Sequence, residues 1–241
     1  MMNRDSIFIG GQWRKPKSTA GISVICPSTE EIIGHVPDAG ADDVVDAVLA
    51  ARKAFDHGPW PRMPMNERVV ILGRAIDLLE PRVAEIAHLV TSEMGVPISV
   101  SQQLTPGALG AARYFLAIAA DTNTVDLRRG QTLAAVLREP VGGVASIAPW
   151  NGPFFQAVAK IIPALVAGCS VIFKPASETP LDVYALAEAL EKAGLPGGVF
   201  NLITGGRDTG RALVSHPGID KVSFTGSTLA GGEIGEVCGR N

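Results

Sequence analysis

Two patterns of hydrophobic spacing divide the chain near residue 141. Before that point, apolar residues recur at helical spacing in three segments, 42–55, 66–93 and 107–120. Asp42 is the candidate cap of the first segment, and Pro81 is expected to divide the second into two helices. Residues 6–36 predict two or three short strands, and the more polar stretch 121–140 predicts a hairpin.

After residue 141, strands and helices are expected to alternate. Continuous apolar runs predict four strands, near 143–148, 170–174, 198–203 and 221–225. Helically spaced segments lie between them, at 154–167, 180–193 and 208–215. This order predicts parallel strands joined by crossover helices, in a sheet covered on both faces. The expected fold class is therefore α/β. Residues 141–241 are expected to form a Rossmann-like region, residues 1–120 to pack on it, and residues 121–140 to form a hairpin arm.

Each predicted strand of this region ends in residues with unusual chemistry. The four ends are Pro149-Trp150-Asn151, Lys174-Pro175-Ala176-Ser177, Thr204-Gly205-Gly206 and Phe224-Thr225-Gly226-Ser227-Thr228. Taken singly, each has an ordinary explanation, such as a lysine leaving a strand for solvent, a glycine turn or a serine cap. Ligands of open parallel sheets bind beyond the carboxyl ends of the strands, so the four ends together predict one site.

The residue types at these ends fit a dinucleotide. Ser227 and neighbouring N–H groups at a helix start favour a phosphate, and Lys174 can donate to ribose hydroxyls or pair with a phosphate. The glycines allow an adenine or a pyrophosphate to approach the backbone. The usual G-x-G-x-x-G fingerprint is absent, and the Gly226–Gly231 stretch lacks the Lys-Ser/Thr of a P-loop. The spacing of these residues by itself therefore supports nucleotide binding only in part.

Composition and charge exclude several classes of function. The 241 residues are 46% hydrophobic and 19% charged, with a net charge of −3, which leaves no electrostatic footprint for nucleic acid or an anionic membrane. No apolar stretch reaches the ~20 residues of a membrane span, and no signal peptide is evident. Cys26, Cys169 and Cys238 form neither a disulfide framework nor a CxxC pair. A cytoplasmic protein without a metal site is expected.

Ordered motifs over almost the whole chain carry a family resemblance. They are Gly11-Gln12-Trp13, Ala54-Phe55 with Trp60 before Arg68, Thr91-Ser92-Glu93-Met94-Gly95, Glu139-Pro140-Val141-Gly142, Pro149-Trp150-Asn151, Phe173-Lys174-Pro175-Ala176-Ser177-Glu178-Thr179-Pro180 and Phe224-Thr225-Gly226-Ser227-Thr228. From about residue 6 to its end, the sequence resembles the aldehyde dehydrogenase superfamily.

The resemblance implies oxidation of an aldehyde to a carboxylic acid with NAD or NADP. In this family a cysteine thiolate attacks the aldehyde, hydride passes to the nicotinamide, and a glutamate activates water to release the acid. Asn151 occupies the place of the amide that holds the oxyanion of the thiohemiacetal. The residues implied to bind the cofactor are Ile147, Ala148, Pro149, Trp150, Lys174, Ser177, Gly205, Phe224, Thr225, Gly226, Ser227 and Ala230.

Two departures from the family pattern change the expectation. Ser177 stands where many NAD-preferring members carry an acidic residue, so repulsion of a 2′-phosphate is removed and NADP is expected to be at least tolerated. The Glu-Leu-Gly-Gly motif of the general base and the motif of the nucleophile do not occur in these 241 residues. We therefore expect the catalytic domain to be missing and the three cysteines to be structural or incidental, since none has a sequence cue for activation.

Several interpretations stay open at this level. The chain is either the amino-terminal half of an aldehyde dehydrogenase (a truncated product, one part of a split gene or an incomplete sequence), or an inactive module that binds a nucleotide or associates with other subunits. The hairpin at 121–140 resembles the family's oligomerisation arm, so a homodimer or homotetramer is expected of the full-length protein. The sequence does not name the aldehyde.

Overall fold

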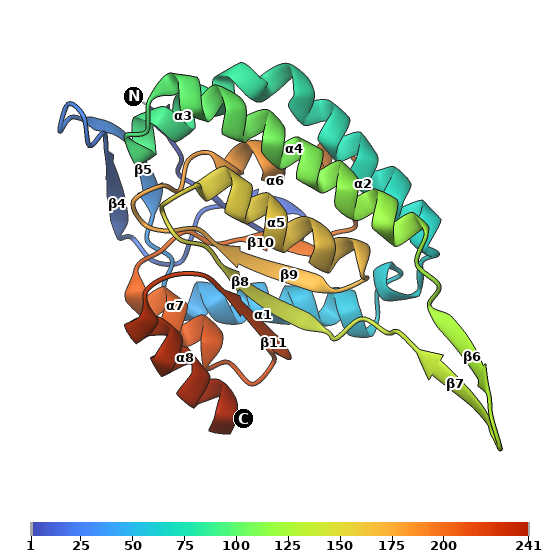
Figure 1. Cartoon of the computed structure of the whole chain (residues 1–241). Coiled ribbons are helices and arrows are strands. Elements are labelled where there is room, and N and C mark those ends of the chain that lie inside the picture. The colour runs from blue at the N-terminus through green and yellow to red at the C-terminus, as the bar shows by residue number, and fades with distance from the viewer. Residues whose placement is uncertain (1, 241) are drawn as a thin grey trace.

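A six-stranded sheet forms the centre of the molecule (Figure 1). The computed structural model describes residues 2–240. The strand order is β11-β8-β9-β10-β2-β3. The strands that follow residue 141 are β8 (Gly143–Ile147), β9 (Ser170–Lys174), β10 (Phe200–Leu202) and β11 (Lys221–Phe224). They pair in parallel with one another, which confirms the predicted parallel sheet.

The amino-terminal segment extends this sheet, which the sequence did not reveal. β2 (Ile7–Ile9) pairs antiparallel with β10, and β3 (Gln12–Arg14) pairs with β2. A second sheet contains β1 (Met2–Asn3), β4 (Gly21–Ile25) and β5 (Ile32–Pro37). Four strands, β2 to β5, therefore occupy the region in which two or three were predicted, and β1 precedes it; β1, β2 and β3 have only two or three residues and are too short to show an alternating pattern.

Helices cover both faces of the central sheet. They are α1 (Ala41–Asp56), α2 (Met65–Leu79), α3 (Val83–Met94), α4 (Ile98–Ala120), α5 (Pro153–Val166), α6 (Val183–Lys192), α7 (Arg207–Val214) and α8 (Thr228–Arg240), with short 3₁₀ turns at Trp60–Arg62 and Glu80–Arg82. α1 and α7 lie on one face, α5 and α6 on the other, and α2, α3 and α4 pack outside α5 and α6 (Figure 1). None of these helices, within residues 2–240, is long and apolar enough to cross a membrane.

Three helix starts differ from the prediction. α4 begins at Ile98 rather than residue 107, because its buried face, which includes Ser101 and Thr105, packs against α3 and α5 and overrides the helix-breaking tendency of Pro106. α6 begins at Val183 rather than 180. At the start of α1 the capping side chain is Asp43, not Asp42, since the Asp43 carboxylate accepts the Gly40 N–H at 3.1 Å.

Two residues of the sequence motifs prove to be anchors of the core. The buried Trp60 indole donates to the Leu165 carbonyl at the end of α5 at 3.0 Å. Arg68 is also buried and donates from Nε to the Val166 carbonyl at 2.9 Å, and burial lowers the pKa of its guanidinium. Both side chains thereby donate to carbonyl groups of the last turn of α5, where the regular hydrogen bonding of the helix ends.

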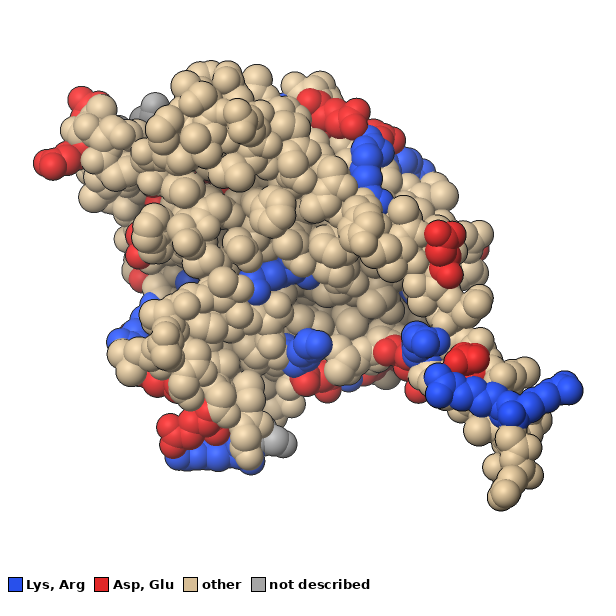
Figure 2. Space-filling view, in the orientation of Figure 1, with Lys and Arg blue, Asp and Glu red and all other residues tan. Residues whose placement is uncertain are grey.

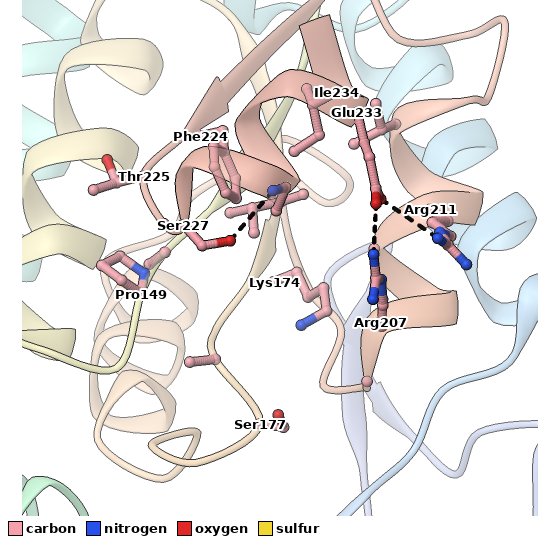
Figure 3. Close-up of a pocket in the computed structure, with 18 of the residues that line it drawn as sticks. Pro149, Lys174, Ser177, Arg207, Arg211, Phe224, Thr225, Ser227, Glu233 and Ile234 are labelled. Carbon is pink, nitrogen blue, oxygen red and sulfur yellow. Dashed lines mark hydrogen bonds and ion pairs between the residues drawn. The ribbon is translucent and has the colours of Figure 1, made fainter. Parts of the chain in front are cut away.

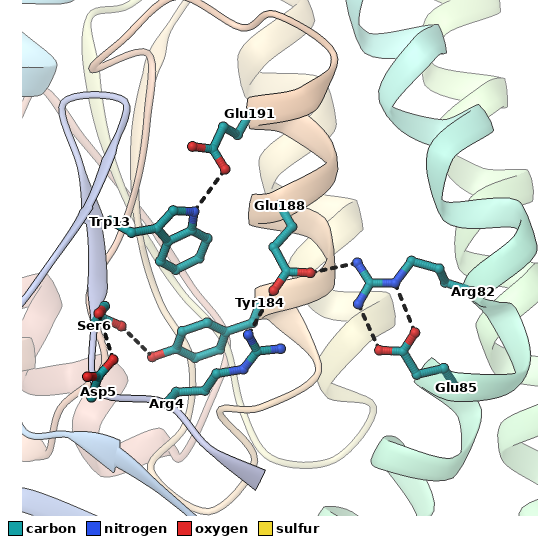
Figure 4. A network of polar contacts seen from close by, with 9 residues as sticks. All are labelled: Arg4, Asp5, Ser6, Trp13, Arg82, Glu85, Tyr184, Glu188 and Glu191. Carbon is teal, nitrogen blue, oxygen red and sulfur yellow. Dashed lines mark hydrogen bonds and ion pairs between the residues drawn. The ribbon is translucent and has the colours of Figure 1, made fainter.

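A polar network fixes the amino-terminal strands to α6 (Figure 4). Trp13 stacks on Tyr184 with ring centroids 5.6 Å apart and donates to Glu191 at 2.9 Å. The Tyr184 hydroxyl donates to the Ser6 carbonyl at 3.0 Å. Glu188 of α6 pairs with both Arg4 and Arg82, each at 2.8 Å. The Trp13 of the first sequence motif therefore has a structural role far from the strand ends.

The predicted hairpin is present and extends away from the body of the molecule (Figure 1). β6 (Val125–Arg129) pairs antiparallel with β7 (Leu133–Leu137) in a separate two-stranded sheet. Its large exposed apolar side chains are Val125, Leu127, Leu133 and Leu137. Figure 2 shows blue cationic side chains gathered on this arm, whereas the face formed by α4 and α5 is almost free of charge.

Candidate functional site

A cavity of about 790 Å³ lies beyond the carboxyl ends of the four parallel strands. Its lining consists of Ile147, Ala148, Pro149, Trp150, Asn151, Lys174, Ala176, Ser177, Glu178, Gly206, Arg207, Gly210, Arg211, Val214, Ser215, Phe224, Thr225, Gly226, Ser227, Ala230, Glu233, Ile234 and Val237. The predicted convergence of the strand ends on one site is therefore found. The position matches the rule that ligands of open α/β sheets bind at this edge.

All but one of the residues proposed from the sequence line this cavity. The exception is Gly205, which is buried, while Gly206 lines the cavity in its place. A Cβ atom at position 205 would overlap the Thr209 side chain, so this glycine serves the packing of the first turn of α7. Thr209 in turn donates to the Ala39 carbonyl at 2.7 Å, which fixes that turn to the loop before α1.

Lys174 is a buried cation on the cavity wall. Lys174 is the last residue of β9 and is only 6% exposed. Its Nζ donates to the Pro175 carbonyl at 2.9 Å. No carboxylate lies within ion-pair distance of it among the described residues. Burial lowers the pKa of the Lys174 ammonium to about 8, although the charges of Glu178 and Asp38 oppose this shift. An ammonium group with one partner has donors left for a ligand.

The opposite wall comes from α7 and α8, and its charged residues are not among those predicted from the sequence. Arg207 and Arg211 of α7 both pair with Glu233 of α8, at 2.6 and 3.4 Å (Figure 3). Hydrogen bonding from Arg207 is the main cause that lowers the pKa of Glu233. The helix predicted at 208–215 is the next element after the strand predicted at 198–203. A helix that starts beyond the carboxyl end of a parallel strand lies at the edge where ligands bind, and this position could have indicated the two arginines.

The strand end after β11 forms the third side of the cavity. The Ser227 hydroxyl accepts the Ala230 N–H at 3.2 Å, so Ser227 caps α8 as predicted (Figure 3). α8 begins at Thr228, and Ser227 and Ala230 place the start of this helix at the cavity. A side chain at Gly226 would collide with the Phe224 ring, so the backbone and that ring lie in close contact there.

Asn151 stands at the mouth of the cavity, in the loop between β8 and α5. The next residue, Gly152, has φ of +91° and precedes the first turn of α5. Its N–H is accepted by the Met94 sulfur at 3.3 Å, so the end of α3 supports the loop from behind. Asn151 itself is exposed. Trp150 lines both this cavity and a second one of about 470 Å³ that reaches toward Glu93.

A pair of buried carboxyl groups supports the start of α5 and α6. Glu93 accepts the N–H groups of Leu181 and Asp182, at 2.6 and 3.1 Å. The Asp182 side chain is fully buried, its Oδ2 has no hydrogen-bond partner, and only the nearby backbone of Val183 and Phe154 favours its charged form. Burial raises the pKa of both carboxyl groups well above the ordinary range, and the charge of Asp182 raises that of Glu93 further.

This pair makes the stability of the fold pH-dependent. Because the folded pKa of Asp182 is raised, the folded chain binds more protons than the unfolded one once the pH exceeds ~4, and the free energy of unfolding falls as the pH rises toward the folded pKa. Asp182→Asn keeps the shape without a titrating group, so we expect it to flatten that slope. Urea denaturation at pH 5, 6, 7 and 8 checks this expectation, and equal slopes for both chains would refute it.

Cysteines and metal ligands do not contribute to the cavity. Cys26, Cys169 and Cys238 are free thiols and none lines it. Hydrogen bonds from Thr29 and the nearby backbone lower the pKa of Cys26, but this residue lies in the turn after β4. Over residues 2–240, no group of three or more His, Cys, Asp or Glu side chains is placed to hold a metal ion.

A sheet of four parallel strands with an open cavity at their carboxyl ends defines an α/β protein of the type that binds its ligand at this edge. A sequence model of the aldehyde dehydrogenase family matches residues 13–241. The chain belongs to the aldehyde dehydrogenase family, and the predicted resemblance is confirmed.

Characterised relatives and solved structures agree with this assignment. The chain is 43% identical to geranial dehydrogenase of Castellaniella defragrans, over 99% of this chain and 51% of that protein. It is 42% identical to phenylacetaldehyde dehydrogenase of Pseudomonas fluorescens, over 98% of this chain and 49% of that protein. A Mycobacterium tuberculosis aldehyde dehydrogenase complexed with NAD⁺ superposes with a TM-score of 0.96 and 44% identity, over 99% of this chain and 50% of that one. The chain thus spans about half the length of the relatives that it matches.

Proposed function

We propose that this chain forms the coenzyme-binding part of an NAD(P)-dependent aldehyde dehydrogenase, which oxidises an aldehyde to a carboxylic acid. The observation that carries the proposal is the convergence of four strand ends on one cavity, with Lys174 buried in its wall and Asn151 at its mouth. The proposed division of the chain is 1–120 as the packing segment, 121–140 as the arm and 141–241 as the coenzyme region.

The residues of the cavity fit a nicotinamide dinucleotide. The free donors of the Lys174 ammonium suit ribose hydroxyls, and the start of α8 with Ser227 suits a phosphate. Val214, Ile234 and Val237 give the part of the cavity between α7 and α8 apolar walls, which suit a flat adenine. When bound, the coenzyme supplies the hydride acceptor for the oxidation.

Asn151 is the one catalytic residue that we assign within this chain. Its side-chain amide can donate to an oxygen that gains negative charge, and it carries no titrating proton. The left-handed turn at Gly152 and the contact with Met94 hold its loop in place. We propose that the thiolate comes from sequence outside these 241 residues, because none of the three cysteines lines the cavity. We propose the same for the general base, because its Glu-Leu-Gly-Gly motif does not occur here. The aldehyde itself is unassigned.

A second candidate function is subunit association without oxidation. β11 pairs only with β8, so within residues 2–240 it is an open edge of the main sheet. The apolar side chains exposed on the β6–β7 arm, with Leu127 and Leu133 the most exposed, add a second contact surface. We propose on this basis that the full-length protein forms a homodimer or homotetramer.

Calorimetric titration of the purified chain with NAD and with NADP tests the coenzyme assignment. We expect the titration to show saturable binding at one site, and the fluorescence of Trp150 to be quenched when the coenzyme binds. When aldehydes are added, we expect no reduction of the coenzyme. Addition of a separately expressed polypeptide that carries the Glu-Leu-Gly-Gly and cysteine segments should restore turnover if the chain is half of an enzyme. Absence of binding to either coenzyme would refute the proposal, and rapid turnover by the chain alone would refute the assigned division of catalytic groups.

The pKa of Lys174 gives this binding a pH dependence. The ammonium form is the donor, and burial lowers its pKa to about 8, so coenzyme affinity should fall as the pH rises above that value. Other charged residues also face this region, namely Glu178, Asp38, Glu233, Arg207 and Arg211. Lys174→Met is the control for their contributions, because the coenzyme affinity that remains in this variant should not fall as the pH rises above 8. Equal affinity at pH 7 and pH 9.5 in the unchanged chain would contradict the assignment of Lys174.

A further inference from the structure

Met94, the last residue of α3, is in contact with the loop that carries Asn151. Its Sδ accepts the Gly152 N–H at 3.3 Å, and Gly152 follows Asn151 directly, with φ of +91°. A thioether sulfur is a weak hydrogen-bond acceptor, and oxidation converts it into a polar sulfoxide. The chain therefore places a side chain with redox chemistry of its own against the loop of the proposed catalytic residue.

The Met94 side chain is reached from solvent through the second cavity, of about 470 Å³. Met94 is half-buried and lines that cavity, and two other lining residues, Ile25 and Trp150, are 52% and 53% exposed. Met63 and Met65 are also half-buried, but neither of them lines this cavity or the larger one. We therefore expect a small oxidant to reach the sulfur of Met94 before it reaches those of Met63 and Met65.

Oxidation changes the contact between Met94 and Gly152 in one of two ways. In the reaction with hydrogen peroxide, one peroxide oxygen bonds to the sulfur, the O–O bond breaks and water leaves, so the sulfur is oxidised and the peroxide is reduced. If the new oxygen accepts the Gly152 N–H, the additional atom pushes the loop away from α3. If the oxygen points elsewhere, the N–H loses its acceptor. Both arrangements displace the loop.

The displaced loop is part of the coenzyme cavity. Trp150 lines both cavities, and Asn151 stands at the mouth of the larger one. Pro149 and Pro153 flank this loop, and the proline ring restricts the backbone at each of these positions. A shift at Gly152 is therefore taken up mainly by the two residues before it, which are the indole and the amide that face the coenzyme cavity.

We propose that Met94 is an oxidation site through which peroxide regulates this chain: the sulfoxide displaces the loop of Trp150 and Asn151 and thereby weakens coenzyme binding. The effect on the coenzyme rests on the proposed function, whereas the displacement of the loop does not. Sulfoxide reductases return methionine sulfoxide to methionine, so the change is reversible.

The test treats the whole chain with dilute hydrogen peroxide and then with dithiothreitol, which reduces sulfenic acid and disulfide forms of the three cysteines but leaves methionine sulfoxide. Peptide mass analysis should find the added oxygen on Met94 before Met63 and Met65. We expect the NMR resonance of the Gly152 amide to shift and the affinity for NAD and NADP to fall by about three- to tenfold, as for the loss of one hydrogen bond. Sulfoxide reductases should restore both.

Three variants separate the role of Met94 from general oxidation. Met94→Gln introduces a polar side chain of similar length that peroxide does not oxidise, and it should lower the affinity for the coenzyme without peroxide. Met94→Leu should show no response to peroxide. Met65→Leu is the matched control, because it also removes a sulfur acceptor, that of an Arg68 N–H at 3.5 Å, away from both cavities. This variant should respond to peroxide as the parent does.

The inference would be overturned if Met94 were oxidised no faster than Met63 and Met65, or if its oxidation left the Gly152 resonance unchanged. A shifted resonance with unchanged coenzyme affinity would overturn the regulation of binding. If the unoxidised chain binds neither coenzyme, the proposed function fails, yet the Gly152 resonance still tests the displacement of the loop. The two failures are therefore distinguishable.

Discussion

Replacement of Lys174 by Met is expected to lower the affinity for the coenzyme by at least about tenfold, with no loss of stability. Each hydrogen bond from a charged donor contributes ~1.5–3 kcal/mol, and ~1.4 kcal/mol corresponds to a factor of ten in the binding constant. The ammonium is buried, and its pKa is lowered to about 8. Burial of this charge therefore lowers the free energy of unfolding. Methionine fills the same space without that cost.

Lys160→Met is the matched control for this variant. Lys160 is also partly buried, its pKa is lowered by burial, and its Nζ donates to the Ser223 hydroxyl at 3.3 Å. It does not line the cavity. Calorimetric titration with NADP and thermal melting should therefore separate the two lysines. If both variants bind equally well, the ammonium of Lys174 does not hold the coenzyme.

Gly142→Ala is expected to destabilise the fold by about 3 kcal/mol or more. Gly142 has φ of +130°, a conformation that alanine rarely adopts, and a Cβ atom there would overlap the Asp220 carboxylate. That carboxylate accepts the Gly143 N–H at 2.7 Å and pairs with Arg52, so it cannot move without loss of the contacts at the start of β8. The glycine of the Glu139-Pro140-Val141-Gly142 motif is thus required by the backbone and not by a ligand.

Gly107→Ala provides the opposite case within the same chain. Gly107 lies inside α4, and an added Cβ atom would meet nothing within 4 Å. Alanine favours a helix over glycine by up to ~1 kcal/mol, so this variant should be more stable than the parent. Urea denaturation of both variants measures the contrast. Similar stabilities would show that the overlap with Asp220 is relieved by a shift of the chain.

The repeating strands and helices after residue 141 could be predicted because each strand is a continuous apolar run that both faces of the sheet bury. Val171, Ile172 and Phe173 illustrate this, since all three are fully buried in β9. The same alternation of strands and helices predicted Lys174, Ser177 and Ser227 at one edge, because parallel strands end on the same side of a sheet. Most of the cavity followed from that one geometric rule.

The parts that could not be predicted depend on contacts between distant segments. β2 joins β10 across nearly 200 residues, and three residues are too few to reveal a period. The side chains of Arg207 and Glu233 meet only because α7 and α8 pack together, and a single sequence gives no signal of that pairing. Gly205 and Gly206 look equivalent in sequence, and only the packing of Thr209 shows which of them faces the cavity.

The most direct test is a crystal structure of the chain soaked with NADP. We expect the adenosine ribose on Lys174, the adenine between α7 and α8, the pyrophosphate at the start of α8 by Ser227, and the nicotinamide end toward Asn151. Electron density for the coenzyme at any other place would contradict the account. So would a coenzyme at full occupancy that does not contact the ends of the four parallel strands.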